Sequence, residues 1–313
     1  MSTDDTRAID IVLQRWRTTL SVTLPGSADA PSLQRAEQVL MTEVDRLERA
    51  ASRFRADSEI SAVNRSAGQW VPSSALLVEL VEVALAAADS TGGLVDPCLG
   101  RQVDAAGYRT WAAGDISVLD PAMPVPVGAG RWGEVEVAPG RVRIPPGVAL
   151  DLGATAKAWL ADEVAERIAD EVGLDVIATM GGDLRVIVGD PGWVVSADHE
   201  VPGVPERRIG ITEGGLATSG QGRRRWLTTA GPAHHLIDPR TGRSADTGWW
   251  AVSALAASAT TANVAATAGM LLDADAPAWF AERGLHGLFT GWSGSGRATS
   301  HTVGQWPGME DAA

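Results

Sequence analysis

The chain has 313 residues, of which 45% are hydrophobic and 21% are charged, and its formal net charge at pH 7 is −13. This composition is typical of a protein with a hydrophobic core, and the negative charge argues against nucleic acid or an anionic membrane surface as a partner. The first residues contain no hydrophobic segment typical of a secretory signal, and no later stretch is long enough to span a membrane. We therefore expect no membrane insertion and a cytoplasmic protein, in which the single cysteine, Cys98, is buried and forms no internal disulfide.

Hydrophobic periodicity predicts the elements of the first half of the chain. After a flexible start over residues 1–13, we expect a strand or hairpin over 14–24, helices over 32–47 and 73–88 with a short helical turn at 52–60 between them, and a hairpin over 135–144. Ser73 is the expected N-cap of the second helix, which Gly92-Gly93 closes.

The stretch from Leu150 to Asp183 is the one around which the chain is organised. Hydrophobic residues alternate over 148–152, which predicts a strand, and a helix follows it as far as Gly173, a typical left-handed C-cap. A strand over 176–180 then leads into Gly-Gly-Asp. A helix N-terminus with Lys157 in its first turn is suited to binding phosphate, but the same spacing fits a tight turn with a solvated lysine. Spacing alone leaves both interpretations open.

The second half of the chain mixes strands and helices without strict alternation. We expect strands over 184–188, 193–197, 252–257 and 285–290, a strand over 235–242 that ends in a turn, and a strand-to-turn signal at Thr218-Ser219-Gly220 within 214–226. A polar loop over 198–210, helices over 261–272 and 277–283, and a flexible tail over 306–313 complete this half. This pattern predicts an α+β fold. We expect a single domain over 14–305, with a mixed, mainly antiparallel sheet and packed helices.

Several short motifs occur in a fixed order along the chain. They are Ser52-Arg53-Phe54-Arg55 with Asp57-Ser58-Glu59-Ile60 and Asn64, Gly93-Leu94-Val95-Asp96-Pro97, Asp151-Leu152-Gly153 with Ala156-Lys157, Gly181-Gly182-Asp183, Thr218-Ser219-Gly220, and His235 through Gly242. Each motif is unspecific alone. Together and in this order they resemble the ApbE-like family of FAD:protein FMN transferases over roughly residues 14–290.

The resemblance implies the flavin-transferase fold and a magnesium-dependent transferase whose substrate is FAD. Such an enzyme splits FAD at its pyrophosphate, attaches FMN by a phosphoester bond to a threonine of an acceptor flavoprotein subunit, and releases AMP. By motif position, the implied flavin contacts are Trp16, Phe54, Leu94, Val95, Asp96, Asp151, Lys157 and Ile237, and the implied Mg²⁺ ligands are the Ala154 carbonyl, Asn263 and Thr267.

The residue types fit this chemistry. Attack on a pyrophosphate requires its negative charge to be neutralised, which a hard divalent ion and a lysine can do. Asn263 and Thr267 are four residues apart and share a helix face, although the small residues around them also fit a packing helix. His235 is either the base for the acceptor hydroxyl or an orienting residue. We expect Asp183 to fix the Gly-Gly turn rather than to take part in the chemistry.

The chain departs from the family pattern at two places. The family has Ala-Asp where this chain has Ala262-Asn263, and Ala266 stands at a second acidic position, so the implied metal site lacks a formal charge. Trp16-Arg17-Thr18 replaces a Met-Gly-Thr pattern. Two alternatives therefore stay open: an FAD pyrophosphatase that yields FMN and AMP, and an FAD-binding protein with a degraded metal site.

Overall fold

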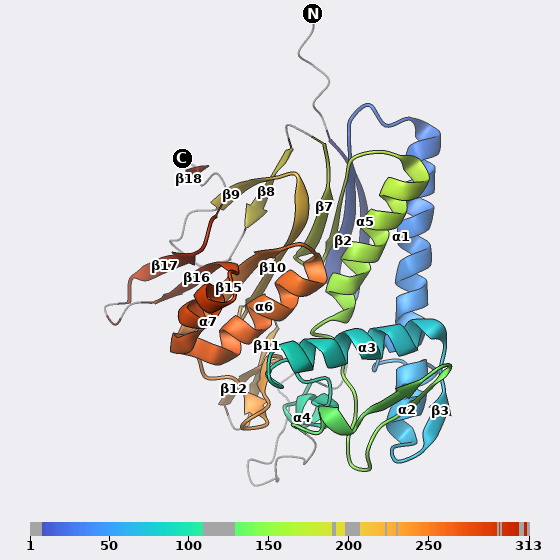
Figure 1. Ribbon diagram of the computed structural model, residues 1–313, viewed down its shortest axis with the longest axis vertical. Coiled ribbons are helices and arrows are strands. Elements are labelled where there is room, and N and C mark those ends of the chain that lie inside the picture. The colour runs from blue at the N-terminus through green and yellow to red at the C-terminus, as the bar shows by residue number, and fades with distance from the viewer. Residues whose placement is uncertain are drawn as a thin grey trace, which may run out of the picture.

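A central antiparallel sheet forms the framework of the molecule (Figure 1). The computed structural model describes residues 8–108, 129–189, 192–197, 207–222, 224–229, 231–292, 294, 296–306 and 310–311. The sheet has eight strands in the order β1-β2-β6-β7-β10-β15-β16-β17. These are β1 (Ile9–Arg15), β2 (Thr18–Leu24), β6 (Val176–Met180), β7 (Asp183–Ile187), β10 (Glu213–Gly220), β15 (Trp249–Ala256), β16 (His286–Trp292) and β17 (Ala298–Val303).

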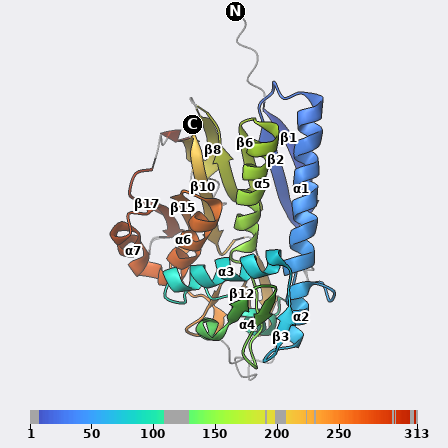
Figure 2. The same cartoon turned by 45° about the vertical axis from the view of Figure 1, so that its right-hand side comes forward.

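Three helices cover one face of this sheet: α1 (Ala30–Ala51), α5 (Ala156–Val172) and α6 (Ala259–Leu272) (Figures 1 and 2). Helical spacing of hydrophobic residues in α1 and α5 makes a stripe that packs on the alternate, inward-facing residues of β2 and β6. The resulting core includes Leu40 of α1, Leu160 of α5 and Val22 of β2, all almost fully buried.

The other face of β6 and β7 carries a smaller sheet of β8 (Trp193–Ala197), β9 (Arg207–Ile211) and β18 (Glu310–Asp311). Successive residues of a strand point to opposite faces, so Ile177 packs beside Val195 and Ile209 while its neighbours in β6 face the helices. Alternation in β6 therefore builds two cores from one strand.

The remaining elements gather mostly at one end of the sheet, at the bottom of Figures 1 and 2. They are α2 (Glu59–Arg65), α3 (Ala75–Ser90), α4 (Gly100–Ala105), β3 (Trp70–Pro72), β4 (Glu136–Ala138), β5 (Arg141–Arg143), β11 (Arg225–Thr228), β12 (Gly231–His234), β13 (Ile237–Asp238) and β14 (Arg243–Ser244), with short 3-10 helices at Trp132–Glu134 and Asp273–Asp275. Helix α7 (Ala276–Glu282) instead packs beside α6 and β16.

The predicted strand over 148–152 is wrong, although its hydrophobic residues are buried as expected. Among the described residues, a single isolated bridge, from Leu99 to Ala149, involves this segment. Its polar backbone groups bond elsewhere: the Asp151 amide donates to the Pro97 carbonyl at 2.9 Å, and the Asn64 side chain both donates to and accepts from the backbone of Leu150. The alternating hydrophobic residues of this segment are buried in the core, but the segment does not pair along its length with another strand.

Other boundaries also differ from the prediction. The first hairpin begins at Ile9, inside the segment expected to be flexible, because Ile9 pairs with Leu24 at the far end of β2. Residues 207–210 of the expected polar loop belong to β9, which runs to Ile211, and Glu310–Asp311 of the expected flexible tail pair with it. The N-cap of α3 is Ser74 instead of Ser73. Gly173 ends α5 in the left-handed conformation, with φ 71° and ψ 26°, as predicted.

Candidate functional site

A cleft of about 360 Å³ lies at the end of the central sheet, beside the N-terminus of α5. The turns from β1 to β2 and from β6 to β7 form part of its wall, and α6 supplies another part. Of the predicted site residues, the following line it: Leu94, Val95, Asp96, Asp151, Ala154, Lys157, His235, Ile237, Asn263 and Thr267. Trp16 and Phe54 line a smaller adjoining cavity, which shares Tyr108, Asp151, Gly153, Lys157 and Arg224 with the cleft.

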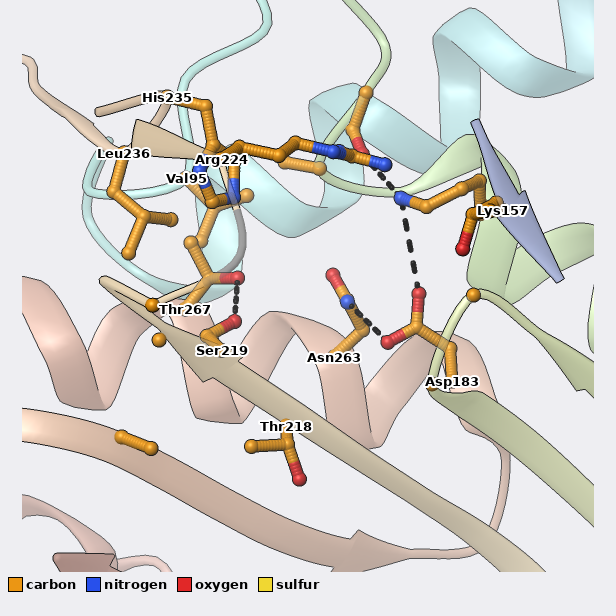
Figure 3. Close-up of a pocket in the computed structure, with 18 of the residues that line it drawn as sticks. Val95, Lys157, Asp183, Thr218, Ser219, Arg224, His235, Leu236, Asn263 and Thr267 are labelled. Atoms are coloured by element: carbon orange, nitrogen blue, oxygen red, sulfur yellow. Dashed lines mark hydrogen bonds and ion pairs between the residues drawn. The ribbon is translucent and has the colours of Figure 1, made fainter. Parts of the chain in front are cut away.

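Lys157 projects from the first turn of α5 into the cleft (Figure 3). Its ammonium lies 3.9 Å from a carboxylate oxygen of Asp183 and donates a hydrogen bond to the Gly153 carbonyl at 3.3 Å. Burial, and to a smaller extent the positive charge of Arg224, lowers the pKa of Lys157 to about 8. The negative charges of Asp183 and Asp151 raise this pKa and offset part of the shift. Thr155, the N-cap of α5, makes no side-chain hydrogen bond to the helix. The free amides at the N-terminus of α5 and the Lys157 ammonium, both of which attract anions, therefore face the same cleft.

The turn between β6 and β7 brings Asp183 next to α6. Beside the place in the turn expected from the sequence, Asp183 has a contact across the cleft: its Oδ1 accepts a hydrogen bond from the Asn263 Nδ2 at 2.9 Å (Figure 3). The turn requires Gly181, whose φ is 71° and where an added Cβ would lie 2.9 Å from the Thr18 hydroxyl. Close approach of the two hairpin turns is thus part of how the cleft is built.

The oxygen atoms of α6 that face the cleft fit a hard cation. Asn263 is buried, and its Oδ1 has no hydrogen-bond partner among the described residues. One turn later, the Thr267 hydroxyl lies 2.8 Å from that of Ser219 at the end of β10. Amide, hydroxyl and carbonyl oxygens beside one carboxylate are ligands that Mg²⁺ accepts. No cluster of three or more His, Cys, Asp or Glu side chains suited to a metal occurs in the described ranges.

His235 lies between β12 and β13 and lines the cleft across from Lys157 (Figure 3). Burial, followed by the positive charges of Arg224 and Lys157, holds its pKa well below the ordinary value. Its buried Nδ1 has no hydrogen-bond partner in the described part of the chain. The imidazole is therefore neutral near pH 7 and able to accept a proton.

An aromatic wall closes the adjoining cavity. Phe54 meets Tyr108 edge to face at a centroid distance of 5.5 Å, and Tyr108 stacks on Trp226 at 5.4 Å. The Arg53 guanidinium lies 4.2 Å from the centre of the Phe54 ring, and its Nε pairs with Asp151 at 2.6 Å. Flat rings and a held guanidinium suit a planar ligand.

Asp96 has a structural role in the turn that the motif Gly-Leu-Val-Asp-Pro forms. Its two carboxylate oxygens accept hydrogen bonds from the backbone amides of Cys98 and Gly130, at 2.7 and 2.6 Å. Burial raises the pKa of Asp96 despite these bonds. The turn presents Leu94 and Val95 to the cleft.

The sequence alone did not indicate Arg224 or Ser219 as cleft residues, although both line it. Ser219 belongs to the Thr-Ser-Gly motif, but the motif alone does not indicate what its side chain contacts. Arg224 stands in an arginine-rich run at 223–225, where composition does not distinguish an inward side chain from a solvated one.

A family model described as "ApbE family" matches residues 16–289, most of the chain. The chain belongs to the ApbE family. Over 267 residues it is 30% identical to a protein of Treponema pallidum named FAD:protein FMN transferase, covering 78% of this chain and 73% of that protein. A Vibrio cholerae protein of the same name is 28% identical over 262 residues, covering 79% and 75%.

Solved ApbE structures share the fold of this ApbE-family chain. The Thermotoga maritima ApbE protein matches with a TM-score of 0.81 at 24% identity, covering 94% of this chain and 96% of that one. The flavinyl transferase ApbE of Pseudomonas stutzeri matches with a TM-score of 0.83 at 19% identity, covering 97% and 96%. Within the described residues, no helix has the length and hydrophobicity to cross a bilayer.

Proposed function

We propose that this ApbE-family chain is an FAD:protein FMN transferase that uses Mg²⁺, attaches FMN by a phosphoester bond to a threonine of an acceptor flavoprotein subunit, and releases AMP. One observation carries the proposal: Lys157 and the open N-terminus of α5 face the same cleft as a neutral His235 and the oxygen atoms of Asn263 and Thr267. The names of the curated relatives support the same activity.

The residues that would hold Mg²⁺ are the Ala154 carbonyl, Asn263 and Thr267, with Asp183 supplying negative charge through its contact with Asn263. Bound there, the ion would supply neutralisation of the diphosphate charge that opposes attack. The unpartnered Asn263 Oδ1 is the observation in favour of this fit, because a buried amide oxygen without a partner is costly.

The chain's own groups account for the transfer. Lys157 binds the diphosphate and opposes the charge that develops on it. His235 accepts the proton of the acceptor threonine as its oxygen forms a bond to the phosphorus of the FMN half. The bond from that phosphorus to the bridging oxygen breaks, and AMP leaves with both electrons of the bond. Because the pKa of His235 lies well below its ordinary value, the imidazole is neutral near pH 7 and one ring nitrogen is available to accept this proton.

The test is to incubate the purified chain with FAD and Mg²⁺, with and without a candidate acceptor subunit. We expect AMP release and a fluorescent flavin adduct on the acceptor, and neither with an acceptor whose threonine is changed to alanine. AMP release that is equal with and without acceptor would support the pyrophosphatase alternative. FAD binding with no AMP under any condition would support a binding protein, which the neutral Asn263 keeps open.

A further inference from the structure

Arg224 is a cation of the cleft that none of the motifs marks. It directly precedes β11, is half-buried, and lines both the main cleft and the adjoining cavity. Its guanidinium makes no hydrogen bond or ion pair with any residue that the structure describes, and Figure 3 shows it turned toward the Lys157 ammonium. Lys157 lines the same two cavities, so the two positive charges lie near each other.

The strand that follows directs this side chain into the cleft. Residues two apart in an extended chain share a face, and Trp226 is buried against Tyr108, a residue of the cleft wall. Arg225 is exposed and does not line the cleft, and its guanidinium lies 5.6 Å from the ring centre of Trp250. The backbone of Arg224 is also fixed, because its carbonyl accepts a hydrogen bond from the His235 amide at 3.3 Å.

Two adjacent cations in a half-buried cleft repel each other unless an anion lies between them. The two nearby carboxylates already have cationic partners: Asp151 pairs with Arg53 at 2.6 Å, and Asp183 lies 3.9 Å from the Lys157 ammonium, which leaves none for Arg224. An excess of positive charge therefore remains at this point of a protein whose net charge is −13. A ligand with two adjacent negative groups, such as a diphosphate, complements it.

We propose that Arg224 is a second cation of the phosphate subsite and binds the FAD diphosphate together with Lys157. The planar guanidinium can donate two parallel hydrogen bonds to phosphate oxygens, which an ammonium cannot do. This inference rests on the transferase function proposed above, and it assigns that site a residue outside the motifs. Arg224 would thus help to select dinucleotides over ligands without phosphate.

The experiment compares FAD and riboflavin binding by flavin fluorescence, with and without Mg²⁺, in the wild type, Arg224→Gln, Arg224→Lys and Arg225→Gln. We expect Arg224→Gln to weaken FAD binding roughly 10- to 100-fold, the usual range for a lost charge-assisted contact, and to leave riboflavin binding unchanged. Arg224→Lys should lose less. Arg225→Gln, the matched control, removes the same charge one residue away and should bind FAD as the wild type does.

Wild-type affinity for FAD in Arg224→Gln, or equal losses for FAD and riboflavin, would overturn the inference and leave the transferase proposal standing. A wild type that binds no FAD would overturn both. Thermal unfolding of each variant without ligand shows whether it folds. If Arg224→Gln does not fold, Arg224→Lys still tests the inference, because a variant that keeps the positive charge should keep the preference for FAD over riboflavin.

Discussion

Lys157 has two possible roles that its contacts alone do not separate, since it touches both the Gly153 carbonyl and Asp183. If the ammonium serves FAD, Lys157→Ala should weaken FAD binding by about 1–3 kcal/mol because a charge-assisted contact to phosphate is lost. Riboflavin, which lacks phosphate, should bind as before. Fluorescence titration with both ligands measures the difference, and equal losses would show that Lys157 only holds the turn at Gly153.

Asn263 is the neutral side chain of the proposed metal site. Its Nδ2 donates to Asp183, so Asn263→Asp replaces a donor with a second carboxyl at hydrogen-bond distance. We expect this variant to lose about 1–3 kcal/mol of unfolding free energy without metal, because one hydrogen bond becomes a like-charge contact. Added Mg²⁺ should restore stability, since it binds the folded state and is a better match for a charged ligand.

The same variant should need less Mg²⁺ for AMP release from FAD, whereas Thr267→Ala should need more. Thermal unfolding with EDTA and across a Mg²⁺ titration gives the stability, and AMP release gives the midpoint. An unchanged midpoint in Asn263→Asp would mean that Asn263 is not a metal ligand and would favour a protein that only binds FAD.

At the scale of elements, the position of α6 depends on one side chain of α5. The Asp162 carboxylate accepts hydrogen bonds from the amides of Ala259 and Thr260, at 2.7 and 2.9 Å, and from the Thr260 hydroxyl at 2.7 Å. These contacts hold the N-terminus of the helix that carries Asn263. Close packing supports them, because an added Cβ at Gly215 of β10 would lie 2.2 Å from the Ala259 nitrogen.

Asp162→Ala should therefore destabilise the fold by about 1–3 kcal/mol, since three donors lose their acceptor. Denaturant unfolding measures the loss. Glu166→Ala is the control on the same helix. The Glu166 side chain is 57% exposed and its contact with Arg185 is long, at 3.8 Å, so this variant should change stability by less than about 0.5 kcal/mol. Equal midpoints for Asp162→Ala and the wild type would show that α6 is held by packing alone.

The helices were the predictable elements: α1, α5 and α6 all form close to their expected ranges. Helices α1 and α5 each bury a periodic face, whereas α6 is a helix of mostly small residues that is buried on nearly all sides. Strand 148–152 failed because its alternating hydrophobic residues enter the core while its backbone bonds to a side chain, Asn64, and a loop carbonyl. Hydrogen bonds between segments this far apart in the chain leave no local pattern in the sequence. Asn263 and Thr267 could be placed on one helix face, whereas the meeting of Asn263 with Asp183 depends on how the β6–β7 turn approaches α6.

Over the whole molecule, charge is distributed unevenly in a way that sequence does not show. A chain with a net charge of −13 gathers Lys157, Arg224 and the positive end of α5 in one cleft. The cost of this arrangement is visible in Lys157, whose pKa is lowered to about 8 first by burial and then by Arg224. An anion in the cleft would reverse part of that shift.

FAD binding should consequently depend on pH through Lys157. Below its pKa of about 8 in the free protein, Lys157 is charged and FAD meets both cations. Bound diphosphate raises the pKa of Lys157, so above pH 8 the binding of FAD is coupled to the uptake of a proton by this side chain. The affinity for FAD should therefore fall by up to about tenfold per pH unit, until the pH exceeds the pKa of Lys157 in the complex. Titrations between pH 6.5 and 9.5 measure this slope. Lys157→Met should bind FAD weakly with a flat profile, and a steep profile in that variant would assign the proton to another group.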